Sequence, residues 1–388
     1  MMVKLGDIFK QQITGEWGTD CDSDELGIYV LRTTNFTSNG DIDYSCVVKR
    51  NIEQSKVEKK KLCFGDIILE KSGGTEKTPV GRVVYCDENI NNSIYLCNNF
   101  TQAMRVNNDI AFSKYVFYFM WYLHLSGKTD LLQNKTTGIR NLQIKAYLKE
   151  DIPLPPLEEQ RKIAETLDKV NNLITKRKQQ LEKLDLLVKS KFVEMFGDCD
   201  NICRVSDVCK IITDGTHQPP QFVEYGIPFL FVSNVVTNKI TYDTQKFISQ
   251  ETYDELIKRT PIEKNDILLS TVGSYGHAAI VEDDRKFLFQ RHIAYLKPDN
   301  NIICSNYFHS ALLSYDVQCQ IYKSVKGIAQ KTLNLSEIRK LKIPLPPIEL
   351  QNQFADFVKQ TEKTKTIIGQ SLEKLETLKK ALMQEYFG

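Results

Sequence analysis

The chain has 388 residues, 41% of them hydrophobic, so it is long enough for two to four domains with their own cores, and its composition excludes intrinsic disorder. Lysine and arginine total 51 against 49 acidic residues and no segment is a basic block, which excludes a general coat of positive charge as the source of affinity for nucleic acid. The start of the chain lacks a signal-peptide core and no run approaches the roughly 18 apolar residues of a membrane span, so we expect a cytoplasmic protein without a membrane partner.

Residues 1 to 150 predict a first domain of mixed sheet with a few helices. Short β-rich runs such as Asp66–Lys71 and Arg82–Cys86 lie between Gly and Asn turns. A helix is expected at Tyr115–His124. The domain is therefore predicted to be α/β rather than all-helical.

Polar, glycine-bearing loops of this first domain are candidates for contacts with nucleic acid. They present amides, hydroxyls and cations, which are the groups that proteins direct at base edges and phosphates. The alternative is an ordinary solvated surface, the usual role of polar loops. The candidates are Arg32, Thr33, Thr34, Asn35, Lys71, Ser72, Gly73, Gly74, Thr75, Lys77, Lys135, Thr136, Thr137, Arg140 and Asn141.

Residues 151 to 197 predict one long helix that forms a central spacer. Pro156 opens it, where a missing amide does no harm, and apolar residues then recur in steps of four and three, with Arg177 and Lys191 as polar interruptions. Pro153–Pro156 also has the spacing of an SH3-type ligand, but helix initiation explains the prolines at both places where they occur. The predicted seam residues are Ile163, Leu167, Val170, Ile174, Leu181, Leu184 and Val188.

Residues 198 to 342 predict a second domain related to the first. Asp266–Leu269 matches Asp66–Leu69, a strand is expected at Phe229–Val236, and a helix is expected within Ser305–Gln320. Its polar loops correspond to those of the first domain. The candidates are Thr213, Asp214, Gly215, Thr216, His217, Gln218, Ser233, Asn234, Ser270, Ser274, Tyr275, His277, Lys323, Lys326, Gln330 and Lys331.

Residues 343 to 388 repeat the spacer. Ile343–Gly388 aligns without a gap to Ile152–Gly197, and 19 of the 46 positions are identical, which indicates an internal duplication with pseudo-twofold symmetry. About forty residues at about 1.5 Å each make each helix roughly 60 Å long, so we expect the two to pair as an antiparallel coiled coil that separates and joins two α/β domains. The alternative is that each helix folds back onto its own domain. The second set of seam residues is Phe354, Val358, Ile368, Leu372, Leu375 and Leu382.

No catalytic or metal site is expected in this chain. Ser72–Thr78 lacks the second glycine of a phosphate-binding P-loop, and His217–Phe222 has Gln221 where an amino-methyltransferase motif needs an aromatic residue. Cys199, Cys203, Cys209 and His217 could be drawn as a zinc site, but without a Cys-x-x-Cys knuckle reduced, buried thiols are the preferred interpretation.

The chain resembles the specificity subunit of type I restriction-modification systems. The most specific similarity is IPLPP-x-E-x-Q, found at Ile152–Gln160 and at Ile343–Gln351. Further similarity lies in GDIILEKSGG of the first domain and in TDGTHQPP of the second, so the resemblance covers essentially the whole chain.

The resemblance implies an α+β protein in which each target-recognition domain reads one half of a split site in double-stranded DNA. The paired helices are then expected to fix the spacing between the halves and to dock methyltransferase subunits, expected as two, with restriction subunits as further candidate partners. S-adenosylmethionine, ATP and Mg²⁺ would belong to those partners, and this chain would hold no cofactor. It would position the duplex while another subunit methylates a flipped adenine.

Two readings from other classes stay open at the level of sequence. A coiled-coil scaffold that binds only protein predicts no affinity for DNA at any salt concentration. A self-sufficient enzyme predicts methyl transfer by the purified chain alone.

Overall fold

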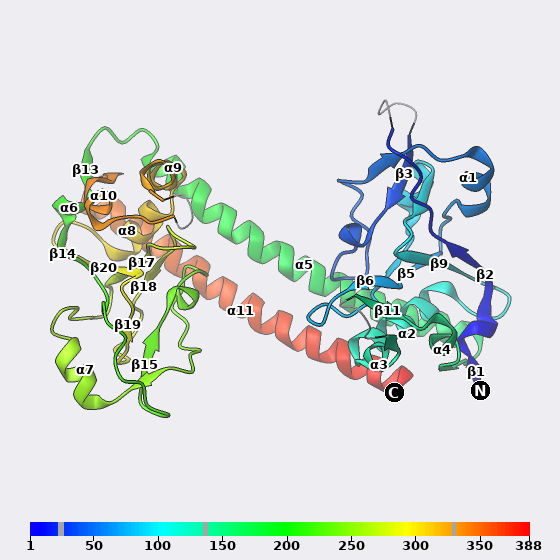
Figure 1. Ribbon diagram of the computed structural model, residues 1–388. Helices are drawn as coiled ribbons and strands as arrows, with labels where there is room; N and C mark the ends of the chain where they lie inside the picture. The colour runs from blue at the N-terminus through cyan, green and yellow to red at the C-terminus, as the bar shows by residue number, and fades with distance from the viewer. Residues whose placement is uncertain (22–26, 135–138, 328–330) are drawn as a thin grey trace. The chain divides into compact units, whose positions relative to one another are not determined.

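The computed structural model describes residues 1–21, 27–134, 139–327 and 331–388. The chain divides into two compact units. Unit 1 comprises Met1–Gln179 with Gly369–Gly388, and unit 2 comprises Gln180–Ile368. The division falls inside both long helices, α5 (Leu157–Phe196) and α11 (Ile348–Phe387), each 40 residues long (Figure 1). The two spacer segments are thus shared between the units, because each unit packs one half of each helix.

Unit 1 contains two principal sheets. The larger is antiparallel in the order β2-β9-β5-β7, and the smaller has the order β4-β3-β8, with β3 and β8 parallel. A third, small sheet has the order β10-β11-β6. The strands are β1 (Met2–Lys4), β2 (Phe9–Thr14), β3 (Ile28–Leu31), β4 (Val48–Arg50), β5 (Ile67–Glu70), β6 (Ser72–Gly74), β7 (Val83–Tyr85), β8 (Tyr95–Cys97), β9 (Thr101–Val106), β10 (Gln133–Asn134), β11 (Arg140–Leu142) and β12 (Asp151–Pro153). The helices are η1 (Leu5–Ile8), η2 (Thr33–Asn35), α1 (Gln54–Lys60), η3 (Glu88–Asn92), α2 (Ser113–Leu125), α3 (Lys128–Leu131) and α4 (Ile144–Tyr147).

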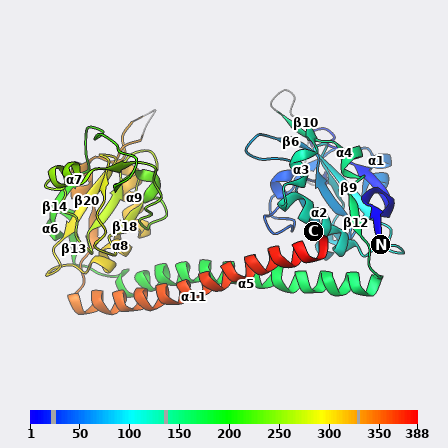
Figure 2. The ribbon, with the colours of Figure 1, turned by 90° about the horizontal axis from the view of Figure 1, so that it is seen from below.

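Unit 2 repeats this plan. Its sheet β14-β20-β17-β18 is antiparallel, and its smaller sheet β16-β15-β19 again contains one parallel pair. Figure 2 shows β14, β20 and β18 together with α8 and α9. The strands are β13 (Ile202–Arg204), β14 (Cys209–Asp214), β15 (Ile227–Leu230), β16 (Phe247–Ile248), β17 (Ile267–Ser270), β18 (Ala278–Ile280), β19 (Leu288–Phe289), β20 (Ile293–Pro298) and β21 (Lys342–Pro344). The helices are α6 (Val205–Val208), η4 (Val232–Asn234), α7 (Gln250–Leu256), α8 (Ser305–Leu312), α9 (Tyr315–Ser324) and α10 (Leu335–Lys340).

The central strands β5 and β17 are buried on both faces, which explains their unbroken apolar sequences. Ile67 and Leu69 pack into the core that contains α2, whereas Ile68 points into the core beside the smaller sheet. Ile267 and Leu269 alternate with Leu268 in the same way. A strand covered on both faces has no polar side to show in its sequence.

Two predicted elements of unit 2 differ in extent from the structure. The expected helix within Ser305–Gln320 is broken into α8 and α9, because Ser314 caps α9 by accepting a hydrogen bond from the backbone N–H of Val317. The strand predicted at Phe229–Val236 ends at Leu230 and turns into η4. The predicted helix at Tyr115–His124 is confirmed within α2.

Within each unit the two helix segments are antiparallel. In unit 1, Lys178 pairs with Glu376 at 3.2 Å, and Lys379 donates to the side-chain carbonyl of Asn171 at 2.9 Å. In unit 2, Lys365 pairs with Asp185 at 2.7 Å. Lys365 and Lys379, two polar residues outside the predicted seam, therefore join the two helices.

The predicted seam residues are buried to different degrees. The first four residues of the α5 seam and Phe354 of α11 are buried. Ile163, Leu167 and Phe354 belong to the domain cores. The remaining ones are partly buried: Leu181, Leu184, Val188, Val358, Ile368, Leu372, Leu375 and Leu382.

The seam prediction omitted the residues that bind the helix ends to the domains. Phe192 and Phe196 of α5 are buried in unit 2, and Met383 and Phe387 of α11 are buried in unit 1. Phe192 and Phe196 follow Val188 of the predicted seam in steps of four, and Met383 directly follows Leu382. All four side chains pack into the domain cores.

Candidate nucleic-acid interface

Three predicted loops of unit 1 converge on one tight turn, formed by residues 98–101 between β8 and β9. The backbone N–H of Asn98 donates to Leu31 O at 2.9 Å, which attaches the loop after β3. The N–H of Lys71 donates to Phe100 O at 2.9 Å, and the N–H of Leu142 donates to Lys71 O at 2.8 Å. We call this set of backbone hydrogen bonds the loop frame of unit 1.

Unit 2 has the same loop frame around residues 290–293. The N–H of Gln290 donates to Leu230 O at 3.1 Å, and the N–H of Thr271 donates to His292 O at 2.9 Å. The N–H of Leu333 in turn donates to Thr271 O at 2.8 Å. The two units therefore hold corresponding loops together by corresponding bonds.

A glycine is required beside each frame. A Cβ on Gly15 would collide with the backbone of Asn98, and a Cβ on Gly215 would collide with that of Phe289. Only glycine lets the end of the first strand of the sheet approach this closely. The predicted base contact at Gly215 is therefore better explained as a packing requirement.

Asn35 and Asn234 are buried and close the loop after β3 or β15. The side-chain oxygen of Asn35 accepts from the N–H of Arg32 at 2.9 Å, and that of Asn234 accepts from Phe231 at 2.9 Å. Both side-chain amides also donate to backbone carbonyls further along the chain. These two candidates hold the loop in shape, and their polar groups are already engaged within the protein.

The remaining predicted residues that the structure describes fall into three groups by burial. The exposed ones are Thr34, Gly73, Thr75, Lys77, Asn141, His217, Gln218, Ser233, Ser274, Lys323, Lys326 and Lys331. The partly buried ones are Arg32, Thr33, Lys71, Ser72, Arg140, Thr213, Asp214, Thr216, Tyr275 and His277. Gly74 and Ser270 are buried like the residues above. Lys135, Thr136, Thr137 and Gln330 lie outside the described residues.

In unit 1 the two later loops form one continuous surface. Ser72 and Asn141 share a side-chain hydrogen bond, and β6 pairs with β11 in the small sheet. Thr75 and Thr78 close the tip of the first loop through their hydroxyls at 2.8 Å. The structure thus brings together residues that lie about seventy positions apart in the sequence.

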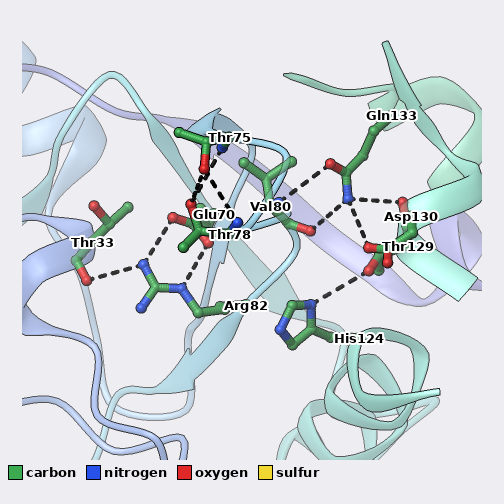
Figure 3. A network of polar contacts seen from close by, with 10 residues as sticks. All are labelled: Thr33, Glu70, Thr75, Thr78, Val80, Arg82, His124, Thr129, Asp130 and Gln133. Atoms are coloured by element: carbon green, nitrogen blue, oxygen red, sulfur yellow. Dashed lines mark hydrogen bonds and ion pairs between the residues drawn. The ribbon is translucent and has the colours of Figure 1, made fainter. Parts of the chain in front are cut away.

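An ion pair stiffens the base of this surface. Arg82 donates to both carboxylate oxygens of the buried Glu70, at 2.8 and 2.9 Å, and to the backbone carbonyl of Thr33 at 3.3 Å (Figure 3). These hydrogen bonds to the Glu70 carboxylate raise the pKa of Arg82 above its ordinary value. Gln133 donates to Val80 O at 3.0 Å on the other side of the loop. Such a two-bond pair fixes geometry as well as charge, so both loops have a rigid support.

In unit 2 the corresponding loops also meet. The N–H of Gly273 donates to Lys331 O at 3.3 Å, and Lys326 and Thr332 exchange backbone hydrogen bonds at 2.9 and 3.0 Å. The ammonium of Lys331 lies 5.1 Å from the centre of the Tyr322 ring. The exposed Lys326 and Lys331 therefore lie on the segment that meets Gly273. Together with the exposed Lys323, near the end of α9, we call them the lysine cluster.

Unit 2 also has an open cleft of about 570 Å³ lined by Gly215–Gln221 and by residues from α7 to Thr260. Beside it, Asp214 lies 2.8 Å from His217 Nε2 and accepts a hydrogen bond from Arg259. Unit 1 has a comparable tie at the end of its first sheet strand, where Lys60 donates to Glu16 at 2.8 Å and lowers the pKa of that carboxyl. These ion pairs anchor the loops to neighbouring helical segments.

The repeated IPLPP-x-E-x-Q motif is a joint between each domain and its helix. Gln160 and Gln351 are fully buried, and each accepts from the N–H that precedes a domain helix, that of Phe112 at 2.8 Å or that of Cys304 at 2.9 Å. Both also donate at 2.8 Å to the carbonyl of the first proline in the motif's Pro-Pro pair, Pro155 or Pro346. The motif is thus structural in both copies.

Two tyrosines complete the joint. Tyr115 donates to Pro153 O at 2.7 Å, and Tyr307 donates to Pro344 O at 2.8 Å. The chain segments that enter and leave each domain pair as the ribbons β1-β12 and β13-β21. Each domain is therefore closed at the point where its long helix begins.

Sequence reasoning missed several residues at the loop frames, notably Asn99, Phe100, Arg291 and His292. Local sequence gives little signal, because these residues belong to no motif and their place in the frames depends on backbone bonds to distant segments. Within the described ranges, no three His, Cys, Asp or Glu side chains come together in a way that could hold a metal ion. No helix in the described part of the chain is long and apolar enough to cross a membrane.

Comparison with known proteins gives consistent matches. A family model described as "Type I restriction modification DNA specificity domain" matches residues 1–183 and 201–377. The chain is 26% identical over 274 residues to the type I restriction enzyme EcoBI specificity subunit of Escherichia coli, a match that covers 62% of this chain and 58% of that protein. It is 24% identical to the putative MjaX specificity subunit of Methanocaldococcus jannaschii over an alignment of 392 residues, which covers 93% and 87% of the two chains.

Solved structures agree in fold. The S subunit of a type I restriction-modification system from M. genitalium has a TM-score of 0.59 at 16% identity, with 100% of this chain and 96% of that chain covered. A chain from a structural study of assembly and conformational transition in the type I R-M system has a TM-score of 0.57 at 16% identity, with 100% and 97% covered. At this identity the likeness concerns the fold alone.

Proposed function

Because the chain belongs to the type I restriction-modification DNA specificity family, we propose that it reads a two-part site in double-stranded DNA, one half with each unit, and that it is not itself catalytic. Each loop frame would face one half-site. Partner subunits would carry out methylation and cleavage.

The observation that carries this proposal is the pairing of one backbone frame with two sets of side chains. Corresponding hydrogen bonds hold the loops of both units, but the side chains mounted on them differ in charge, size and polarity. Two units with the same backbone frame and different side chains suit two different short DNA sequences. Side chains distinguish bases by hydrogen bonds and apolar contacts to the base edges. The paired positions, unit 1 first, are Arg32 and Phe231, Thr33 and Val232, Thr34 and Ser233, Glu70 and Ser270, Lys71 and Thr271, Asn99 and Arg291, and Phe100 and His292.

The exposed candidate residues supply the two kinds of contact that such a reader needs. Lys77, Lys323 and Lys331 are exposed cations suited to phosphates, and Asn141 and Gln218 are exposed amides suited to base edges. The near-neutral charge of the whole chain means that these local groups, rather than a basic surface, would set the affinity.

We assign the two long helices to spacing and docking. Each helix continues without a break from one unit into the other, so its length would set the number of bases between the half-sites. Exposed apolar residues on α5, such as Leu186 and Val193, favour the docking of modification subunits, which we take to be two. Restriction subunits would bind to the modification subunits. S-adenosylmethionine, ATP and Mg²⁺ would be bound by these partners.

Methylome sequencing of cells with and without this chain tests the proposal. We expect a bipartite methylation motif that is present only with the chain, and tight binding of that duplex by the complex with modification subunits. Exchange of residues 1 to 150 for those of another family member should alter only one half of the motif. Equal affinity for unrelated duplexes, or changes in both halves after the exchange, would contradict the proposal. Methyl transfer by the purified chain alone would support the hypothesis of a self-sufficient enzyme. Binding to protein partners but to no DNA would support the hypothesis of a coiled-coil scaffold.

A further inference from the structure

Phe100 is an exposed aromatic ring at the centre of the loop frame of unit 1. Its residue is 51% exposed, although single exposed apolar side chains are common and carry no meaning by themselves. The difference here is the backbone that carries the ring. Phe100 O accepts hydrogen bonds from the N–H groups of both Lys71, at 2.9 Å, and Ser72, at 3.1 Å.

The turn that holds Phe100 is fixed from its own side as well. Thr101 is fully buried and donates to Asn98 O from its backbone N–H at 3.0 Å and from its hydroxyl at 2.9 Å. The N–H of Asn98 is bonded to the loop after β3. An exposed side chain on so constrained a backbone loses little conformational freedom when it binds a ligand.

The ring lies against glycine rather than against a side chain that would cover it. A Cβ built on Gly73 would be 3.6 Å from Cδ1 of Phe100, and Gly73 has φ +96°, a conformation that favours glycine. The polar residues Ser72 and Asn141, bonded to each other, lie on the adjoining strands. Phe100 is therefore an apolar group held among hydrogen-bonding groups.

The matching position of unit 2 has the opposite character. His292 occupies the place of Phe100, since its carbonyl accepts from the N–H of Thr271 as that of Phe100 accepts from Lys71. Arg291, which precedes it, is exposed. The tip of the turn is thus apolar in unit 1 and polar or cationic in unit 2.

We propose that Phe100 determines specificity by making an apolar contact with a base in the half-site that unit 1 reads, an inference that rests on the function proposed above. Two base features offer this chemistry. The C5-methyl group of thymine is the apolar mark of the major groove, and the face of an unstacked base accepts an aromatic ring. The matching pair Arg291 and His292 presents hydrogen-bonding groups instead, so the two half-sites would be read by different chemistry on the same frame.

The test uses Phe100→Ala in the full chain, assembled with its modification subunits, on the duplex identified from the methylome. We expect about tenfold weaker binding of this duplex, with no change on a duplex whose first half-site is scrambled. Selection of bases in the other half-site should be unchanged. The variant should melt like the wild type, because the ring lies outside the core.

The matched control is Phe64→Ala. Phe64 is 54% exposed and precedes β5, whereas Lys71 follows it, so this phenylalanine lies at the opposite end of the same strand. Its removal should leave affinity unchanged. Phe100→Leu, which keeps an apolar group, should retain more affinity than the alanine variant.

Two modified duplexes separate the sources of the contact. If the ring touches a thymine methyl, replacing that thymine by deoxyuridine weakens wild-type binding but not binding by Phe100→Ala. If it stacks on a base, 2-aminopurine at that position is more fluorescent with the wild type than with the variant. If the Phe100→Ala protein keeps the affinity and the methylation motif of the wild type, this inference alone is overturned. If the wild-type protein binds the identified duplex and a scrambled duplex equally well, the proposed function is overturned.

Discussion

The side-chain carbonyl of Gln160 accepts a hydrogen bond from the backbone N–H of Phe112 over 2.8 Å. Phe112 precedes α2, so a residue in the first turn of the long helix caps the main helix of the domain. The same relationship joins Gln351 to Cys304, which precedes α8 in unit 2. The most specific motif of the sequence thus fixes the attachment of each domain to its helix, and no role in DNA reading is needed to explain it.

Replacing Gln160 or Gln351 by Ala should destabilise the corresponding unit by about 1 to 3 kcal/mol, because a buried N–H and a buried carbonyl each lose their partner. Chemical denaturation of the full chain measures this. Gln353→Ala is the control, since Gln353 is exposed on the same helix. Equal stability of the Gln351 and Gln353 variants would show that the joint contributes nothing.

Phe387→Ala should loosen unit 1, although this residue lies more than 260 positions from the helix it touches. Its ring is buried 5.2 Å from that of Tyr115 and 5.8 Å from that of Phe119, measured between centroids. Loss of a buried phenylalanine costs about 3 to 5 kcal/mol. Hydrogen exchange should show reduced protection of α2, while α8 keeps its protection. Leu378→Ala, at an exposed site on α11, should change neither helix.

The stability of unit 1 should rise with pH between about 8 and 10.5 because of Lys379. Burial and the nearby Lys178 ammonium lower the pKa of Lys379 to about 8, although its amine lies 3.5 Å from the centre of the Trp121 ring. In this range the unfolded chain binds more protons than the folded one, so deprotonation favours the folded state. Discounted for partial exposure, the contribution is about 1 to 2 kcal/mol.

The measurement compares the free energy of unfolding of the wild type with that of Lys379→Met over this pH range. Other lysines and tyrosines titrate in both proteins, so their effect cancels in the difference. The variant should be more stable at pH 8, and the difference should shrink as the pH approaches 10.5. A difference that is independent of pH would contradict the shifted pKa.

Replacing Lys323, Lys326 and Lys331 together by Gln should weaken DNA binding equally on matched and mismatched duplexes. Each phosphate contact that is lost should reduce the slope of log K against log salt concentration by about 0.9. Titrations at several salt concentrations measure this slope. Lys264→Gln serves as the control, because Lys264 is exposed before β17 whereas the lysine cluster lies beyond its other end. An unchanged slope in the triple variant would remove these lysines from the interface.

Insertion of seven residues after Gln180, with seven matched residues after Ile368, should lengthen the gap in the recognised site by about three base pairs. Seven helical residues add about 10 Å, and a base pair rises about 3.4 Å. Methylome sequencing gives the new motif directly. Seven residues inserted instead at the exposed turn of Asn300 and Asn301 should leave the gap unchanged. An unchanged gap in the helix variant would refute the role of the helices in spacing.

Local patterns in the sequence determined the elements and their repetition. Steps of three and four marked both long helices, and unbroken apolar runs marked β5 and β17, because side-chain periodicity follows from the geometry of the helix and of a strand covered on both faces. The gapless repeat established the duplication, and the family resemblance identified the chain's class.

Only the tertiary structure decided which polar loop residues face solvent. Asn35 and Asn234 are residue types that often contact DNA, but both are buried and their side chains hydrogen-bond within their own loops. Phe100 is a residue type that usually lies in a core, but it is exposed. Likewise, Phe387 belongs to the core of unit 1 although the sequence places it at the far end of the second helix. Burial at these positions depends on hydrogen bonds and contacts between segments far apart in the chain, and no local pattern of residues encodes such partners.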